Sequence, residues 1–234
     1  MNSPDVTTIL RLLSDKSRVT ILDILMDGRA YTVNEITSFT KLKQHTVSYH
    51  LKLLTEAKLT TVTQYGKFRY YSISDTITPE LFEMLSNYSP LEPTKSYNQH
   101  FAKKELKQAR TCYDHLAGEL GVKIKDFLTS ENIIAENKST NDNYIVTTSG
   151  EGFLKEELNI NVTDLKNKKR KFCINCLDWS ERKNHIAGAL AKAILDFLIE
   201  KQYIIRHSGS RAITITDKGK LFFKENWHII LADN

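Results

Sequence analysis

The chain contains few of the residues that mark unusual protein classes. Nine glycines and four prolines among 234 residues are too few for a collagen-like or disordered chain. No apolar run approaches the roughly 18 residues that span a bilayer. The first ten residues also lack a basic segment followed by an apolar block, so they do not resemble a secretory signal. We therefore expect a globular, cytoplasmic protein that does not cross a membrane.

Cysteine is also scarce. The three cysteines, Cys112, Cys173 and Cys176, are an odd number spread over a long chain. This pattern argues against a disulfide scaffold and favours free thiols in a reducing compartment.

Acidic residues are nearly missing from one segment, although the whole chain is only mildly basic. The net charge is +5 and the sequence pI is about 8.9. Residues 1–40 contain four Lys or Arg residues and five acids, whereas residues 41–70 contain six basic residues and Glu56 alone. A local positive potential of this kind attracts phosphate and raises encounter rates with nucleic acid.

The spacing of apolar residues predicts a mainly α protein with short β-hairpin wings, which is an α+β class. Apolar stripes predict two helices near the N-terminus. Thr32, followed by Glu35, forms a capping box that begins a third, short helix. A longer helix is expected over 44–57. The period then changes, and residues 60–75 predict a hairpin.

A linker is expected near the end of the first third of the chain. Pro79 begins a further predicted helix over 79–88, and "SPLEPTKS", residues 89–96, holds two of the four prolines. We therefore predict a winged helix-turn-helix domain over 1–88, a linker over 89–96 and a C-terminal domain over 97–234.

The predicted C-terminal domain contains an internal repeat. "HLAGELGVKIKDFLTSENII" and "HIAGALAKAILDFLIEKQYI" align without gaps, and each is followed by a related segment with a Thr-x-x-Gly element. We predict two repeated helix–hairpin–helix units, about 112–160 and 176–230, each opened by a long helix. Packing their apolar faces together would form one domain for dimerisation or effector sensing.

The predicted helix 44–57 has an unusual polar face. Val47, Leu51 and Leu54 share one side at 100° per residue. The opposite side carries hydrogen-bonding side chains of mixed type and almost no acid. Gln can bond adenine, His and Lys can donate to guanine, and Ser or Tyr can reach phosphate. The alternative interpretation is a solvated face on an all-helical core.

The neighbouring elements favour DNA binding over the solvated face. A short helix, a tight turn and the longer helix form a helix-turn-helix, and the following hairpin is a wing that can touch the DNA backbone or minor groove. The side chains expected to contact DNA are Lys43, Gln44, His45, Thr46, Ser48, Tyr49, Lys52, Lys67 and Arg69.

Residues 5–75 resemble the winged-helix domain of the ArsR/SmtB family of bacterial transcriptional regulators. The matching stretches, in order, are "LLSDKSRVTILDILMDGRAYTVNEI", "KLKQHTVSYHLKLLTEAKL" and "YGKFRYYSIS". The resemblance implies a homodimer that reads two half-sites of a double-stranded DNA operator, and repression that an effector relieves. "CYDHLAGELGV" and "CLDWSERKNHIAGAL" resemble the C-terminal part of a longer branch of that family.

The family's familiar metal sites have no counterpart here. "YTVNEITSF" lacks the Cys-x-Cys pair that many members carry, and "TPELFEMLSNY" lacks the histidine ligands that others place on a C-terminal helix. Neither metal site can be transferred to this chain by resemblance.

Three cysteines and two histidines form a separate candidate site. Cys173 and Cys176 are a Cys-x-x-Cys pair, Cys112 and Cys176 each precede one copy of the repeat, and His115 and His185 open the matching predicted helices. Three thiolates would suit arsenite, and two or three thiolates with a histidine would suit zinc. A redox or electrophile response is equally open. Alternatively, the cysteines are small buried hydrophobes and the histidines are helix caps.

We therefore predict a DNA-binding repressor and not an enzyme. A second hypothesis is a Cys/His-dependent enzyme or ligand-binding protein built on the repeats, with Cys176 and His185 as nucleophile and base. The chain lacks Gly-x-Ser-x-Gly, a phosphate-binding glycine loop and His-Glu-x-x-His. A third hypothesis is a winged-helix module that binds protein alone.

Overall fold

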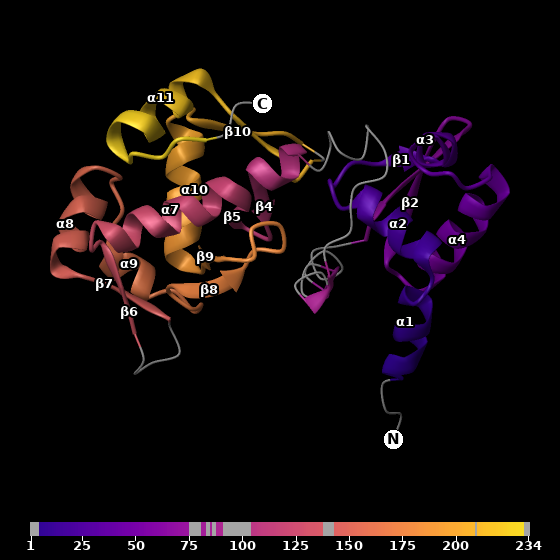
Figure 1. Ribbon diagram of the computed structural model, residues 1–234, viewed down its shortest axis with the longest axis horizontal. Coiled ribbons are helices and arrows are strands. Elements are labelled where there is room, and N and C mark those ends of the chain that lie inside the picture. Colours follow the sequence, from indigo (N-terminus) through magenta and orange to yellow (C-terminus); the bar gives the residue numbers. More distant parts are fainter. Residues whose placement is uncertain are drawn as a thin grey trace. The chain divides into compact units, whose positions relative to one another are not determined.

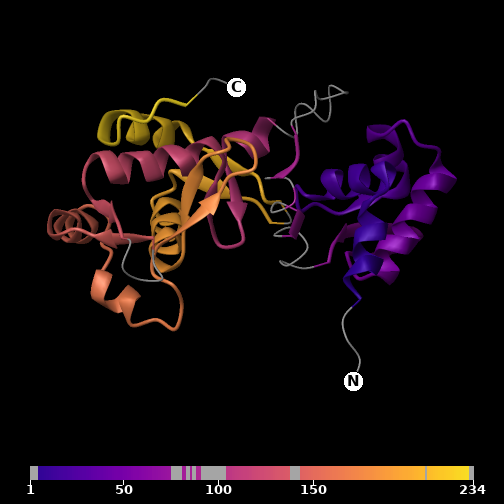
Figure 2. The ribbon, with the colours of Figure 1, turned by 60° about the horizontal axis from the view of Figure 1, so that its bottom comes forward.

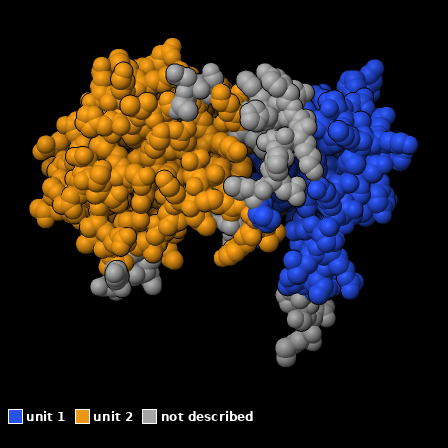
Figure 3. Space-filling view, in the orientation of Figure 1, with its two compact units in different colours: residues 1–82, 90–103, 208–211 blue, residues 83–89, 104–207, 212–234 orange. Residues whose placement is uncertain are grey.

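The computed structural model describes residues 5–74, 81–82, 85, 88–90, 104–137, 143–208 and 210–231. The chain divides into two compact units, one with residues 1–82, 90–103 and 208–211 and the other with residues 83–89, 104–207 and 212–234 (Figure 3). Most of the predicted helix 79–88 and most of the predicted linker 89–96 lie outside the described residues. Among the described residues, no helix combines the length and apolarity needed to cross a bilayer.

The described residues 5–74 of the first unit form the helices α1 to α4 and a small sheet (Figure 1). In chain order its labelled elements are α1 (Val6–Leu13), α2 (Lys16–Leu25), β1 (Tyr31–Thr32), α3 (Val33–Phe39), α4 (Gln44–Glu56), β2 (Thr60–Tyr65) and β3 (Phe68–Ile73).

Side-chain caps fix where these helices begin. The Asp15 carboxylate accepts hydrogen bonds from two backbone N–H groups in the first turn of α2. Thr32 and Glu35 form the predicted capping box at the start of α3. Such caps satisfy N–H groups that have no partner inside the helix. The predicted start of α3 is therefore confirmed.

One apolar cluster holds the three helices α2, α3 and α4 together. Its buried residues are Ile21, Leu22, Leu25, Ile36, Val47, Leu51, Leu54 and Leu59. All three predicted apolar residues of α4, Val47, Leu51 and Leu54, are completely buried. The core therefore fixes which side of α4 faces outward.

The wing is a three-stranded antiparallel sheet in the order β1–β3–β2. The predicted hairpin pairs Tyr65 with Phe68 at its tip, with Gly66 at φ +58° in the turn. The short strand β1 was not predicted from the sequence. Its two residues pair with Tyr71 and Tyr70 and join the start of α3 to the wing.

The second unit consists of hairpins and helices packed on a second, larger core. Its labelled elements are β4 (Arg110–Cys112), β5 (His115–Ala117), α7 (Gly118–Ser130), β6 (Ile134–Glu136), β7 (Tyr144–Val146), α8 (Thr148–Glu156), α9 (Val162–Lys166), β8 (Ile174–Leu177), β9 (Asn184–Ala187), α10 (Ala189–Glu200), β10 (Ile204–Arg206), β11 (Ile213–Ile215) and α11 (Asp217–Asn226).

The long helices α7 and α10 supply the centre of this core. Each is buried along residues four apart: Leu120, Ile124 and Leu128 on α7, and Leu190, Ile194 and Leu198 on α10. Helix α7 packs against β9, and α10 packs against β5. Figures 1 and 2 show α11 lying beside α7, where the rings of Phe127 and Trp227 stack with their centroids 5.2 Å apart.

The prediction that His115 and His185 open helices was wrong. Both lie in strands, and α7 and α10 begin only at Gly118 and Ala189. Gly118 and Gly188 have φ of +79° and +98°, values that glycine adopts readily because it has no Cβ. This backbone bend ends each hairpin before its helix begins.

Candidate DNA-binding surface and cysteine–histidine cluster

The side of α4 opposite the core is open to solvent. At 100° per residue, Gln44, His45, Ser48, Tyr49 and Lys52 lie within an arc of about 140°. All five are exposed, and Tyr49 retains 59% of its surface. A solvent-facing polar arc on a helix that the core holds rigidly can be presented to another molecule.

The other predicted DNA-contacting residues have mixed environments. Lys43, Lys67 and Arg69 are exposed, whereas Thr46 is only partly exposed. His50, on the same helix, is buried with 8% of its surface exposed. The structure thus turns eight of the nine predicted contact residues fully outward.

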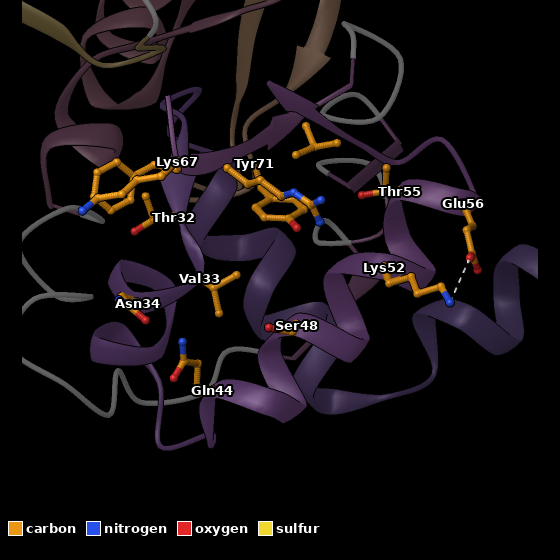
Figure 4. A pocket seen from close by; sticks show the side chains of 13 residues that line it. Thr32, Val33, Asn34, Gln44, Ser48, Lys52, Thr55, Glu56, Lys67 and Tyr71 are labelled. Carbon is orange, nitrogen blue, oxygen red and sulfur yellow. Dashed lines mark ion pairs between the residues drawn. The ribbon is translucent and has the colours of Figure 1, made fainter. Parts of the chain in front are cut away.

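A hollow of about 620 Å³ lies between α4, the start of α3 and the wing (Figure 4). Gln44, Ser48 and Lys52, one helical turn apart, line its α4 side. The remaining lining residues are Thr32, Val33, Asn34, Thr55, Glu56, Val62, Lys67, Phe68, Arg69 and Tyr71. The structure therefore places five of the nine predicted residues around one concave surface.

The charge in this hollow is mostly positive. Lys52, Lys67 and Arg69 face a single lining carboxylate, that of Glu56. Lys52 Nζ and Glu56 Oε1 are 3.8 Å apart, and both side chains are largely exposed, so this ion pair is weak. The hollow suits a polyanion.

Sequence reasoning missed Asn34 and the aromatic residues Phe68 and Tyr71 as lining residues. Asn34 lies in the first turn of α3, and the two aromatic residues lie on β3. The capping box at Thr32 could have identified Asn34 from the sequence. It marks the first turn of α3, which is the first helix of the helix-turn-helix.

A second cluster lies in the other unit, where two hairpins meet. Cys112 pairs with His115 across β4–β5, and Cys176 pairs with His185 across β8–β9. The ligand atoms of all four residues lie within 4.8 Å of one another. The two sulfurs are 3.9 Å apart, and the two Nε2 atoms are 3.1 Å apart. Four of the five predicted metal-ligating residues therefore converge.

Cys173 does not join this group. It is completely buried in the hydrophobic core of the unit. Cys173 precedes the strand β8 (Ile174–Leu177), which carries Cys176, and lies in a bend of the backbone. The Cys-x-x-Cys spacing that predicted a chelating pair is thus divided between the core and the cluster.

Asp178 anchors the histidine side of the cluster. Its carboxylate lies 3.4 Å from His185 Nδ1 and 2.9 Å from Arg110 Nη2, and all three side chains are buried. Burial opposes ionisation of Asp178, but His185, Arg110 and further hydrogen bonds outweigh it and hold the pKa of this carboxyl far below its usual range.

His185 shows the complementary effect. Burial disfavours the charged imidazolium, but the Asp178 carboxylate and the Cys112 thiol outweigh burial and raise the pKa of His185. The second histidine also has a carboxylate neighbour, since His115 Nδ1 is 3.6 Å from the Asp114 carboxylate. Both rings therefore point Nε2 into the cluster and Nδ1 toward an acid.

A short helix, a longer helix with an exposed polar arc and an adjoining basic hairpin define a winged helix-turn-helix DNA-binding protein. Comparisons with known proteins agree. Residues 13–63 match the family described as "Helix-turn-helix domain". The chain is 40% identical over 227 residues, 97% of this chain and 99% of the relative, to the protein of Bacillus subtilis strain 168 described as the uncharacterized HTH-type transcriptional regulator YdfF.

Other similar proteins match a smaller share of the chain. An arsenical resistance operon repressor of Staphylococcus aureus is 31% identical over 86 residues, 37% of this chain and 82% of the repressor. A solved winged helix-turn-helix domain of Mb0332 from Mycobacterium bovis aligns with 42% of this chain and 99% of that domain, at 21% identity and a TM-score of 0.34. The chain belongs to the ArsR family of helix-turn-helix transcriptional regulators.

Proposed function

We propose that the protein is a dimeric repressor that reads a double-stranded DNA operator through α4. The observation that carries this proposal is the exposed polar arc of α4, held by a fully buried apolar side and bordered by a basic wing. A recognition helix needs both properties, because a major groove about 12 Å wide admits a helix whose outward side chains are fixed in direction.

Different side chains of the surface would have different tasks. Gln44 and His45, in the first turn of α4, are suited to hydrogen bonds with base edges. Ser48, Tyr49 and Lys52 lie farther along the same arc. Lys67 and Arg69, on the wing, are suited to phosphate, which positions the protein without reading sequence.

A homodimer is supported by the apolar side of α1. Val6 and Leu10 lie one turn apart and retain 63% and 54% of their surface, which is unusual for large apolar residues four apart on one helix. A second copy of the chain would cover this side. Two recognition helices related by twofold symmetry would then contact half-sites about 34 Å apart.

The second unit is proposed as a duplicated domain that senses an effector and releases the DNA. Support comes from the aligned sequences and from matching helix caps in the two halves. The Thr147 hydroxyl accepts a hydrogen bond from Gly150 N at 2.9 Å, and the Thr216 hydroxyl accepts one from Gly219 N at the same distance. Relatives named as repressors of resistance operons also favour release by an effector.

Gel-shift titrations of the full chain on its own promoter fragment test the DNA-binding proposal, with a scrambled fragment for comparison. Gln44→Ala is expected to weaken binding to the promoter by about 1–3 kcal/mol while leaving the scrambled fragment unaffected, because a base contact carries the sequence information. Lys67→Ala is expected to weaken binding to both fragments. It should also reduce the slope of log affinity against log salt concentration by about 1.

Lys224→Ala is the matched control, since it removes one exposed lysine from α11 in the other unit. We expect it to bind both fragments as the wild type does. Equal loss on both fragments from Gln44→Ala would refute base reading by α4. Equal affinity of the wild type for both fragments would refute a sequence-specific repressor.

A further inference from the structure

We propose that Cys112, His115, Cys176 and His185 bind one divalent zinc-class cation, which joins the two hairpins of the second unit. The proposal is independent of DNA binding by α4. It assigns the ion two sulfur and two nitrogen ligands, one of each from either hairpin.

The distance between the two sulfurs and the distance between the two nitrogens are close to those of a tetrahedral site. Zinc bonds of about 2.3 Å to sulfur and about 2.0–2.1 Å to nitrogen place two sulfurs about 3.8 Å apart and two nitrogens about 3.4 Å apart. The observed separations are 3.9 Å between Cys112 Sγ and Cys176 Sγ, and 3.1 Å between the two Nε2 atoms. These two pairs would need shifts of a few tenths of an ångström to hold an ion, and all four ligand atoms lie within 4.8 Å of one another.

The surroundings of both histidines favour metal binding through Nε2. Asp114 lies beside Nδ1 of His115 and Asp178 beside Nδ1 of His185. At 3.6 Å and 3.4 Å these contacts are too long for good hydrogen bonds, but a carboxylate this close favours the proton on Nδ1 and leaves the Nε2 lone pair for a metal. Two Nε2 lone pairs 3.1 Å apart would repel each other unless a proton or a cation lies between them.

The local backbone keeps these ligands close without a metal. Tyr113, in the tight turn between Cys112 and His115, has φ +57°. Gly121, in the first turns of α7, approaches His185: a Cβ there would lie 3.5 Å from the His185 Cβ and 2.6 Å from the carbonyl oxygen of Leu116. The contact with His185 is ordinary, but a side chain here would clash with β5, so the glycine is needed for α7 to pack closely on the β4–β5 hairpin.

The composition of the site selects the ion. Two thiolates and two imidazoles form a Cys₂His₂ set, which is typical of closed structural zinc sites, and two thiolates neutralise a divalent charge. Arsenite would be better served by three thiolates, but Cys173 lies in the core. Magnesium and calcium prefer oxygen ligands. Entry is possible from the side of Cys176, the only partly exposed ligand among the four.

Two other chemistries compete for the same residues. A Cys112–Cys176 disulfide would need the sulfurs, now 3.9 Å apart, at about 2.05 Å. A catalytic Cys–His–Asp arrangement would need an accessible nucleophile; Cys112 exposes only 5% of its surface, whereas Cys176 is partly exposed and could serve. Both alternatives predict thiol chemistry that does not depend on a metal.

Cobalt titration of the full-length protein tests the proposal. The protein is reduced, stripped with a chelator and titrated with Co²⁺, and then Zn²⁺ is added to displace the cobalt. We expect one Co²⁺ per chain, the visible absorption of a tetrahedral site and a thiolate charge-transfer band as intense as two thiolates produce. Binding of no Co²⁺, or a spectrum of six oxygen ligands, would overturn the proposal.

Cys176→Ser is the main variant, because its partial exposure makes the substitution easy to accommodate. It should halve the charge-transfer band per bound cobalt and weaken Zn²⁺ binding by at least about 100-fold, more than the loss of a supporting contact. Cys173→Ala is the matched control, and its charge-transfer band and Zn²⁺ affinity should equal those of the wild type. A thiolate band that falls in Cys173→Ala and not in Cys176→Ser would contradict the assignment.

Thermal unfolding provides a second readout that does not depend on the spectrum. Zinc should raise the unfolding midpoint of the wild type and of Cys173→Ala as its concentration rises, since an ion that binds the folded state alone stabilises it. The midpoint of folded Cys176→Ser should respond much less. An equal response of all three proteins would refute a site built on Cys176.

Discussion

Replacement of Asp178 by asparagine tests how the second unit holds a buried charge. One carboxylate oxygen of Asp178 accepts hydrogen bonds from Arg110 Nη2 at 2.9 Å and from Gly118 N at 2.6 Å. The other oxygen accepts from the backbone N–H groups of Ser180 and Glu181 and from the Ser180 hydroxyl. Asp178→Asn keeps the shape but places an NH₂ group against Arg110 and Gly118.

The expected loss of stability follows from this arrangement. An amide oxygen can keep the contacts to Ser180 and Glu181, so that turn should survive. The guanidinium of Arg110, which exposes 1% of its surface, loses its anionic partner. Removing one partner of a buried pair costs about 3–5 kcal/mol, because the remaining charge stays away from water. For a unit of this size, about 4 °C per kcal/mol gives a fall of about 12–20 °C in the unfolding midpoint.

Tryptophan fluorescence isolates the unit in which this change occurs. The chain has two tryptophans, Trp179 and Trp227, and both belong to the second unit. Trp179 lies over the Arg110 guanidinium, 4.8 Å from its carbon to the ring centroid, and Trp227 is buried. Thermal unfolding in a chelator, followed by this fluorescence, therefore measures the charge effect without any contribution from a bound metal.

An exposed ion pair in the same unit is the control. Arg170 contacts Asp114 at 2.6 Å, but the two side chains keep 35% and 21% of their surface. Arg170→Met should therefore cost at most about 1 kcal/mol. A shift below about 4 °C in Asp178→Asn, or an equal shift in both variants, would refute the argument from burial.

Four further substitutions test local packing and capping. Gly150→Ala places a Cβ on the carbonyl oxygen of Ile133 and should destabilise the second unit by about 1–3 kcal/mol, whereas Gly152→Ala, with open space around its Cβ, should stabilise α8 by about 0.5–1 kcal/mol in urea unfolding. A stabilising Gly150→Ala would contradict the close approach. Leu51→Ala empties a fully buried site and should cost the first unit about 2–5 kcal/mol, measured by circular dichroism in urea. Thr32→Ala removes the cap of α3 and should lower the free energy of unfolding by about 1 kcal/mol in the same measurement. An unchanged free energy of unfolding would contradict a stabilising role of the cap.

The local features of the first unit were predictable from the sequence because each depends on residues close in the chain. The capping box of Thr32 and Glu35 involves residues three apart, and the buried side of α4 follows from the helical period. The hairpin around Gly66 follows from the change to strand residues. The strand β1 was missed because two residues carry no periodic signal and gain their structure only from pairing with β3.

The sequence also located both candidate sites, but it did not identify all of their residues correctly. It placed the polar residues of α4 on one face, while the hollow shared with Asn34 and Tyr71 required α3 and the wing to pack beside that helix. It named Cys173 as a ligand, because a Cys-x-x-Cys pair chelates when its backbone turns. Here Cys173 lies just before β8 and is buried in the core, whereas Cys176 lies within the strand.

By itself, the sequence determined the type of each long helix, the caps and the outward polar face of α4, since helical period and local hydrogen bonding decide these. Only the tertiary structure decided that Cys112 and His115 meet Cys176 and His185. Those pairs are separated by more than sixty positions in the chain, and their approach depends on α7 and α10 each packing against the hairpin of the other half. Contacts at such separation arise from burial of a common core, which no local pattern specifies.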